Sequence, residues 1–399
     1  MEKSAKRTNI ILFVVFSIII VIRYMSSFGI DIYSDEAEIL DCIQSIIKTG
    51  KDVYGNRMPL FTKVGAGLST YPFLYPMVLF MMPLKKVGAL KARWILQTLT
   101  ILSCFLTAKS VNLWIKDKKI FWITLFIGLT LPWGFIETNR VWDPAFVPLY
   151  FSIFFYFYSK LMNATDTKKK LSIYSTLTFS SLVFLAIVYP PNRIPAVALW
   201  IYCFTKAIKE KKLQGKTIPV VIVVCTILSL PLAYNILFNP LFNQRTTDLL
   251  VFKGGDLYRE VFFFLRNIGT YFSLNYLFIT GDEIIRHSLP MCGILGTVSL
   301  VPVIYSIKNP IKDRNGKELI KMFALIFAFT ILSVALTDEY HPHTLRLCMA
   351  MVPSGILLSI LWNNMINISK RKWPYVLMLL GFVAFYAIYI MIVVGIIWI

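Results

Sequence analysis

Eleven apolar runs, most of them close to the length that carries a helix across a bilayer, constrain this chain more than any other feature. Lipid offers backbone amides no hydrogen-bond partner, so such runs fold as a bundle of membrane-spanning helices. An outer-membrane barrel is excluded, because barrel strands alternate in polarity over about ten residues. The runs cover residues 9–28, 92–113, 120–136, 144–162, 172–189, 194–207, 217–236, 291–307, 320–336, 347–367 and 374–397.

Composition agrees with an all-α polytopic membrane protein. Of the 399 residues, 57% are hydrophobic and only 16% are charged, whereas a soluble domain is about 25% charged. The net charge of +20 does not indicate nucleic-acid binding, because the basic residues lie in short clusters between the apolar runs. The six cysteines show no metal-site spacing and are expected to be buried. The first run lacks a cleavage site, so we expect a retained span.

The segment 72–84 decides how the chain is threaded. It contains three prolines and is shorter than a span, so we expect it to lie parallel to the membrane. With a cytoplasmic N-terminus, the loops after Leu106 then place 21 Lys and Arg residues inside and 8 outside. The positive-inside rule therefore favours about eleven spans and an outer C-terminus, in the plasma membrane. Eight basic residues between Lys48 and Arg93 count against this threading, but their loop approaches the length where the rule weakens.

This threading places most acidic residues, and all three histidines, on the outer face. Residues 1–399 are interpreted as a single membrane domain with two long outer loops, at 29–91 and 237–290. The aromatic stretch 258–278 of the second loop is expected to lie on the bilayer surface as an amphipathic helix, or simply to form an interfacial aromatic belt.

Three acidic residues are candidates for catalysis. Asp35 and Glu36 follow the first span directly, and two adjacent carboxylates at a membrane boundary are costly unless they are solvated or used. Either is suited to act as a general base, although a loop helix capped by Ser34 is a purely structural alternative. Asp143 precedes Pro144 and is either a helix N-cap or a second site residue.

Basic residues at the outer helix ends are candidates for binding a phosphate. Guanidinium groups pair bidentately with phosphate, and an arginine at a helix start opposes the helix dipole unless an anion is present. The candidates for substrate binding are Arg140, Arg193, Arg286, His287, His343 and Arg346. A metal site formed by His341 and His343 with Asp338 and Glu339 fits no strong ligand spacing, so a divalent cation stays an open alternative.

With these residues in place, the sequence resembles membrane glycosyltransferases of the GT-C fold, in particular protein O-mannosyltransferases and bacterial aminoarabinose transferases of lipid A. The resemblance is strongest over residues 1–200 and 275–350. The pair Asp35-Glu36 matches the acidic pair of the family's first outer loop, and Asp143 in VWDP matches the second acid. Segment 72–84 matches a membrane-parallel helix. GDEIIRHS and HPHTLR resemble stretches of bacterial members, but the sequence shows no soluble C-terminal domain, so the acceptor is not implied.

The resemblance implies an inverting glycosyltransferase acting at the outer face. A sugar on a polyprenyl phosphate, expected to be undecaprenyl phosphate, is transferred to a hydroxyl of a glycan, lipid or protein. The arginines hold the phosphate leaving group, and Asp35 takes the acceptor proton. Glu36 and Asp143 position the substrates or tune Asp35 by like-charge proximity. No nucleotide-binding motif is present, which fits a lipid-borne donor, and this scheme requires no cofactor.

Two other classes of function remain open. A transporter or flippase of lipid-linked sugars is expected to carry ionisable residues near mid-membrane, whereas these spans hold almost none. A non-catalytic assembly subunit would tolerate the loss of Asp35 without losing activity.

Overall fold

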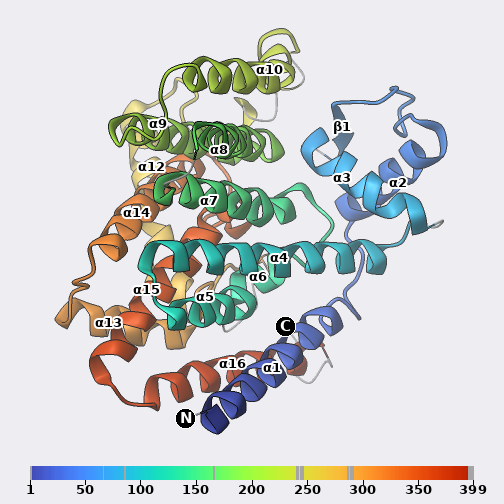
Figure 1. The fold of residues 1–399 in the computed structure, drawn as a ribbon. Helices are drawn as coiled ribbons and strands as arrows, with labels where there is room; N and C mark the ends of the chain where they lie inside the picture. Colours follow the sequence, from blue (N-terminus) through green and yellow to red (C-terminus); the bar gives the residue numbers. More distant parts are fainter. Residues whose placement is uncertain are drawn as a thin grey trace.

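The computed structural model describes residues 2–65, 67–84, 87–164, 167–239, 242, 247–284, 287 and 292–393. Long helices lie side by side as a bundle, and a smaller lobe projects from one end of it (Figure 1). A helix is present in each of the eleven apolar runs, as predicted: α1 (Glu2–Met25), α4 (Ala89–Ile115), α5 (Lys118–Thr130), α7 (Val147–Asn163), α8 (Lys168–Val188), α9 (Arg193–Lys209), α10 (Thr217–Phe238), α13 (Leu300–Lys308), α14 (Arg314–Ala335), α15 (Met351–Ser369) and α16 (Trp373–Val393).

Six helical stretches of the described chain are long and apolar enough to cross a membrane, which makes this a multi-pass membrane protein. They are Ala89–Ile115, Asp143–Asn163, Lys168–Val188, Thr217–Phe238, Arg314–Ala335 and Thr344–Ser369. In the other helices the apolar stretch is shorter, as in Ile10–Met25 of α1 and Trp373–Tyr389 of α16. Helix α13 has only nine residues, about 14 Å of helix against a hydrocarbon core of about 30 Å. The figure of eleven spans therefore stays a prediction.

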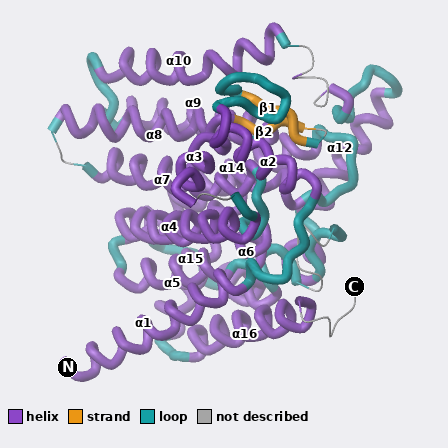
Figure 2. Tube along the Cα trace, turned by 90° about the vertical axis from the view of Figure 1, so that its right-hand side faces the viewer, coloured by secondary structure: helices purple, strands orange, loops and turns teal. Residues whose placement is uncertain are grey.

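The remaining elements lie in the connections between these helices. They are α2 (Ser34–Thr49), β1 (Phe61–Val64), β2 (Gly67–Thr70), α3 (Tyr71–Met81), α6 (Pro132–Glu137), α12 (Leu257–Tyr271) and the short turns η1 (Met82–Leu84), η2 (Asp143–Phe146), η3 (Pro190–Asn192), η4 (Asn275–Ile279), η5 (Thr297–Ser299) and η6 (Thr344–Ala350). Figure 2 shows the hairpin, α12 and the long loops on one side of the bundle and the short loops on the other.

The strands β1 and β2 correct the all-α expectation. They pair antiparallel with Phe61 opposite Thr70 and Val64 opposite Gly67. Gly65 begins the turn with φ at +52°, a conformation that glycine adopts without steric cost. The hairpin sits in the projecting lobe with α2 and α3 (Figure 1).

Helix α3 forms within segment 72–84, which we expected not to span. Its eleven residues make about 16 Å of helix, too short for the hydrocarbon core. The helix buries Phe73, Leu74 and Met77 completely, and it packs against α2, α4 and α8. These contacts support a helix of the outer lobe, while its angle to the membrane stays a prediction.

Arg23 fastens α1 to the bundle at a break in another helix. Helix α5 ends before Pro132, which cannot donate a backbone hydrogen bond. The fully buried guanidinium of Arg23 donates to the carbonyl oxygens of Leu129 (2.7 Å) and Gly134 (3.1 Å), on either side of the break. It also donates to Gln97 Oε1 on α4 at 3.0 Å. An arginine fits here because its planar group carries several donors at fixed angles.

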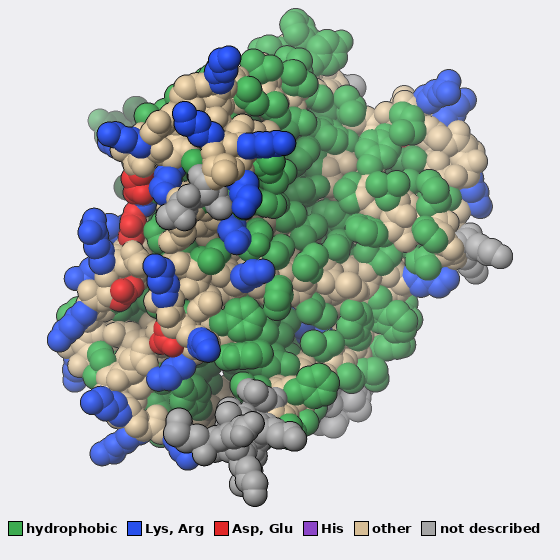
Figure 3. All heavy atoms as spheres, in the orientation of Figure 1, with side chains coloured by type: hydrophobic (Ala, Val, Ile, Leu, Met, Phe, Trp, Pro, Cys, Tyr) green, Lys and Arg blue, Asp and Glu red, His purple; other side chains and the backbone are tan. Residues whose placement is uncertain are grey.

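Surface chemistry separates the two ends of the bundle. In Figure 3 lysines and arginines crowd the left edge, and a band of hydrophobic side chains covers the centre. Only 11% of the apolar stretch of helix α10 is buried inside the protein, as expected for a helix that faces lipid. Helix α12 lies in the aromatic stretch 258–278 and exposes Tyr258, Phe262 and Leu265 while burying Asn267 and Tyr271. Its position on the bilayer surface stays a prediction.

Labelling of single cysteines tests the orientation. The native cysteines are buried or half-buried, so they add little background. In right-side-out vesicles, we expect Tyr258→Cys to react with an impermeant maleimide, because Tyr258 is 90% exposed in a predicted outer loop. Lys169→Cys, exposed at a predicted inner end, should react only after permeabilisation. The opposite pattern would invert the orientation.

Candidate functional site

Asp35 stands in the first turn of α2, where the hairpin turn closes over it. Ser34 was considered as the residue that caps this helix, but it is instead the first residue of the helix. Tyr33 occupies the N-cap position and makes no side-chain hydrogen bond to the helix. A Cβ added to Gly65 would lie 2.5 Å from Asp35 Oδ1, so a larger residue would displace the Asp35 carboxyl from this position. The Gly65 amide donates to Glu38 Oε2 at 2.6 Å. The carboxyl of Asp35 therefore lies at the turn end of the hairpin and is half-buried.

Glu36 points the other way, into the protein. It is 2% exposed and forms an ion pair with Arg93 of α4, which is 3% exposed. The pair is bidentate, with Arg93 Nε at 2.8 Å and Nη2 at 2.6 Å from the two carboxylate oxygens. Glu36 Oε1 also accepts from the Val141 amide at 3.1 Å. This arrangement, which we name the Glu36 joint, ties the first outer loop to α4 and to the loop after α6.

Arg93 extends the Glu36 joint toward α1. Its guanidinium donates to the backbone carbonyls of Ile30 (2.8 Å) and Asp31 (3.2 Å), in the segment between α1 and α2. Arg140 donates to the same Asp31 carbonyl at 3.0 Å. One of the basic residues that counted against the threading is therefore a buried structural arginine.

Asp143 lies at the open end of the hairpin. Its Oδ1 accepts from the Thr70 amide at 2.9 Å and from Thr70 Oγ1 at 3.0 Å. The short helix η2 begins at Asp143 itself, with Trp142 in the capping position and no side-chain cap. The carboxylate thus holds the first outer loop rather than closing its own helix. Asp35 and Asp143 flank one hairpin, at its two ends.

The predicted arginines differ in how they are engaged. Arg346 is buried and forms an ion pair with Glu339. Arg193, at the start of α9, lies 5.2 Å from the ring of Phe242, and its buried Nε has no hydrogen-bond partner among the described residues. Arg286 lies outside the described residues.

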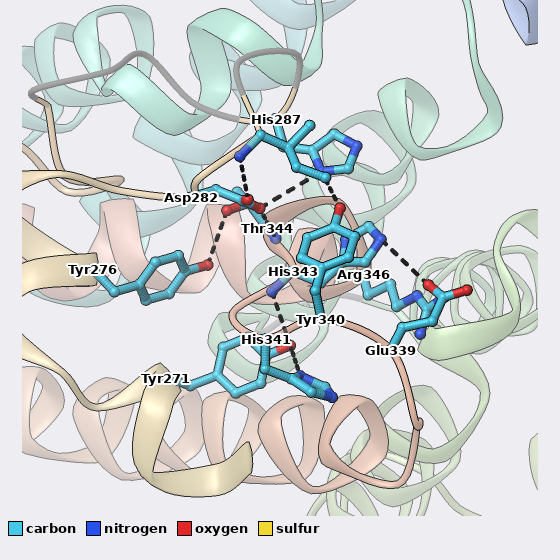
Figure 4. Close-up of polar contacts among 11 residues, drawn as sticks. Tyr271, Tyr276, Asp282, His287, Glu339, Tyr340, His341, His343, Thr344 and Arg346 are labelled. Carbon is cyan, nitrogen blue, oxygen red and sulfur yellow. Dashed lines mark hydrogen bonds and ion pairs between the residues drawn. The ribbon is translucent and has the colours of Figure 1, made fainter. Parts of the chain in front are cut away.

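The histidines separate into two groups (Figure 4). His341 belongs to one, since its ring binds the Tyr271 hydroxyl at 2.9 Å and the Thr337 carbonyl at 2.8 Å. His287 and His343 belong to the other. Their rings stack 4.7 Å apart beside the carboxylate of Asp282. These three residues are buried, and their ligand atoms lie within 4.8 Å of one another. They, rather than Asp338 and His341, could hold a metal ion.

Glu137 is a buried carboxyl next to this second group. It is fully buried at the end of α6, and neither oxygen has a hydrogen-bond partner among the described residues. Burial raises the pKa of Glu137 well above its usual value, and the nearby charge of Asp282 raises it further, while Arg140 lowers it.

Sequence reasoning missed the partners that hold these residues in place. Arg93 was counted only as a loop charge, Thr70 carried no signal, and Asp282 was noted only within a stretch of resemblance. The sole usable signal was the glycine-rich turn near Gly65 between two short runs with β-forming residues.

The fold is that of GT-C membrane glycosyltransferases. Two crystal structures of the aminoarabinose transferase ArnT from Cupriavidus metallidurans, one bound to undecaprenyl phosphate and one in the apo state, match with TM-scores of 0.57 and 0.56 at 12% and 11% identity. The two alignments cover 89% and 90% of this chain, which spans 60% of the length of ArnT. An oligosaccharyltransferase from Archaeoglobus fulgidus matches with a TM-score of 0.48 at 12% identity. That alignment covers 94% of this chain and 52% of the oligosaccharyltransferase chain.

No protein-family model and no curated protein sequence matches the chain. At such low identity the similarity to ArnT establishes the fold alone. It confirms the GT-C fold class and the resemblance to aminoarabinose transferases; donor, acceptor and site residues stay proposals.

The Glu36 joint can be tested by removing one partner. Arg93→Met should lower the free energy of unfolding by about 3–5 kcal/mol, because it leaves the Glu36 carboxylate buried without a counter-charge. The double variant Glu36→Leu/Arg93→Met should recover most of this loss. The measurement is denaturant unfolding in detergent.

Lys91→Met provides the matched control, since Lys91 is exposed in the same turn of α4. We expect it to change stability by less than about 0.5 kcal/mol. Equal stability of Arg93→Met and Lys91→Met would show that the ion pair does not hold the loop.

Proposed function

We propose that the chain is an inverting glycosyltransferase that moves a sugar from a polyprenyl-phosphate donor to a hydroxyl acceptor at the outer face of the membrane. The observation that carries the proposal is the position of Asp35 and Asp143, which flank one hairpin beside the end of a GT-C helical bundle. The similarity of the fold to ArnT, whose crystal structure holds undecaprenyl phosphate, supports a lipid-linked donor.

The three carboxylates take different roles in this proposal. Asp35 is the general base, because it is half-buried at the turn of the hairpin, whereas Glu36 already neutralises Arg93. We therefore replace the substrate role expected for Glu36 by a positioning role. Asp143 holds Thr70 through Oδ1 and, in this proposal, orients a substrate hydroxyl.

The proposed reaction forms one bond, breaks one bond and transfers one proton. The acceptor oxygen gives its proton to Asp35 and forms a bond to the anomeric carbon of the donor. The bond from that carbon to the phosphate oxygen breaks, and polyprenyl phosphate leaves. Attack opposite the leaving group inverts the configuration. Arg193 and Arg346 each have a buried nitrogen without a hydrogen-bond partner among the described residues. Arg193 is the proposed phosphate contact, because Arg346 already pairs with Glu339.

Substitution of the base tests the chemistry. Asp35→Asn keeps the shape of the side chain but cannot accept a proton, so transfer should fall by about 10²–10⁴-fold. Asp41→Asn is the matched control, since Asp41 is exposed on the same helix, and it should retain wild-type activity. The assay uses purified protein with a radiolabelled polyprenyl-phosphate sugar. Full transfer by Asp35→Asn would remove Asp35 as base and favour the assembly-subunit alternative.

Donor binding tests the proposed phosphate contact. Arg193→Lys should weaken binding of polyprenyl phosphate by about tenfold or more, because an ammonium group cannot make a bidentate contact. Arg140→Lys serves as the comparison, since Arg140 already donates to the Asp31 carbonyl. Microscale thermophoresis with a short-chain polyprenyl phosphate measures both. Equal affinities for the two variants would contradict a phosphate contact at Arg193.

A further inference from the structure

We propose that Asp282, His287 and His343 form a binding site for a divalent transition metal ion, with Zn²⁺ as the preferred occupant. The inference starts from the cluster in Figure 4 and does not depend on the transfer reaction. Asp282 and His287 come from the loop after η4, and His343 comes from the loop before η6. Two imidazoles and one carboxylate are a ligand set that zinc accepts, with a fourth position for water.

The distances are close to those that zinc requires. Bonds of about 2.0–2.1 Å in a tetrahedral site place ligand atoms about 3.3 Å apart. Asp282 Oδ2 lies 3.6 Å from His287 Nδ1, and all three ligand atoms fall within 4.8 Å. Contraction of the largest separation by up to about 1.5 Å would therefore bring the ligand atoms to the tetrahedral spacing.

Surrounding groups hold the ligands in orientation. The carboxylate of Asp282 accepts from the backbone amides of Ile284 (2.9 Å) and Thr344 (2.8 Å). His343 Nε2 lies 4.0 Å from Glu339 Oε2, a carboxylate that can orient the imidazole ring. Carboxylates and backbone groups commonly orient metal-binding imidazoles in this way.

Tyr340 contacts both histidines of the proposed metal site. Its hydroxyl lies 2.9 Å from His287 Nδ1, and its ring stacks on His343 at 4.7 Å. Binding through Nδ1 requires the hydroxyl to turn away, and Tyr340 is 38% exposed, which gives it room to do so.

A buried carboxyl group near the cluster adds a further acidic group to the site. Glu137 is fully buried, and its oxygens have no hydrogen-bond partner among the described residues. A divalent ion nearby would stabilise the ionised form of this carboxyl. Trp142 packs on His287 with ring centroids 6.1 Å apart, so an ion here would join the loop after α6 to the two loops that supply ligands.

Zinc titration tests the site. The full chain, with its purification tag removed, is treated with chelator and titrated with ZnCl₂ in detergent by calorimetry. We expect one equivalent to bind. His287→Gln and His343→Gln should weaken binding by about 100-fold or more, since even the loss of an orienting partner costs 10–100-fold. His341→Gln is the matched control, because this ring lies in the same loop as His343 but binds Tyr271 and Thr337.

Thermal unfolding separates metal loss from misfolding. Zinc should raise the melting temperature of the wild type and of His341→Gln, and should leave that of His343→Gln unchanged. Asp282→Asn is a second variant in case a histidine variant does not fold. Asp35→Asn should bind zinc like the wild type. A failure of the zinc proposal can therefore be distinguished from a failure of the proposed transfer reaction. A wild type that binds no stoichiometric zinc, or equal binding by the His343→Gln and His341→Gln variants, would overturn the proposal.

Discussion

The bidentate ion pair between Glu36 and Arg93 is the interaction on which the arrangement of the loops around the hairpin depends. It joins the first outer loop to α4, and through Val141 it fixes the loop that carries Asp143. Two charges buried together contribute little net stability compared with apolar residues of similar size. What they provide is a unique register, since a carboxylate that has left water must find the one guanidinium that matches it.

This ion pair explains why the adjacent acids Asp35 and Glu36 have different positions in the structure. Asp35 and Glu36 are adjacent on a helix, so their side chains point about 100° apart. The direction that sends Glu36 into the protein sends Asp35 toward the hairpin turn at Gly65. The fixed carboxylate thus determines where the proposed base stands, and Asp143, bonded to Thr70, fixes the other end of the same hairpin.

The sequence predicted the helices far better than the contacts between them. Apolar runs define helices because the bilayer leaves the backbone no alternative, and each predicted run contains one. The hairpin was missed because two strands of four residues give almost no periodic signal. Arg93 could not be assigned to Glu36, since 57 residues separate them and any of eight basic residues could have served. His341 and His343 were grouped by their spacing, yet the fold separates them and brings Asp282 and His287 to His343 instead.

The contacts of Arg23 bear on the order in which the chain assembles. Helix α1 is synthesised before Gln97, Leu129 and Gly134, which bind its arginine and follow more than seventy residues later. Until they arrive, Arg23 has to be accommodated by headgroups and water, which its place near the end of α1 allows. Insertion of the first helix and its docking are therefore separate events in biogenesis. The contacts of Arg23 at the break before Pro132 can form only after α4, α5 and α6 have all been synthesised.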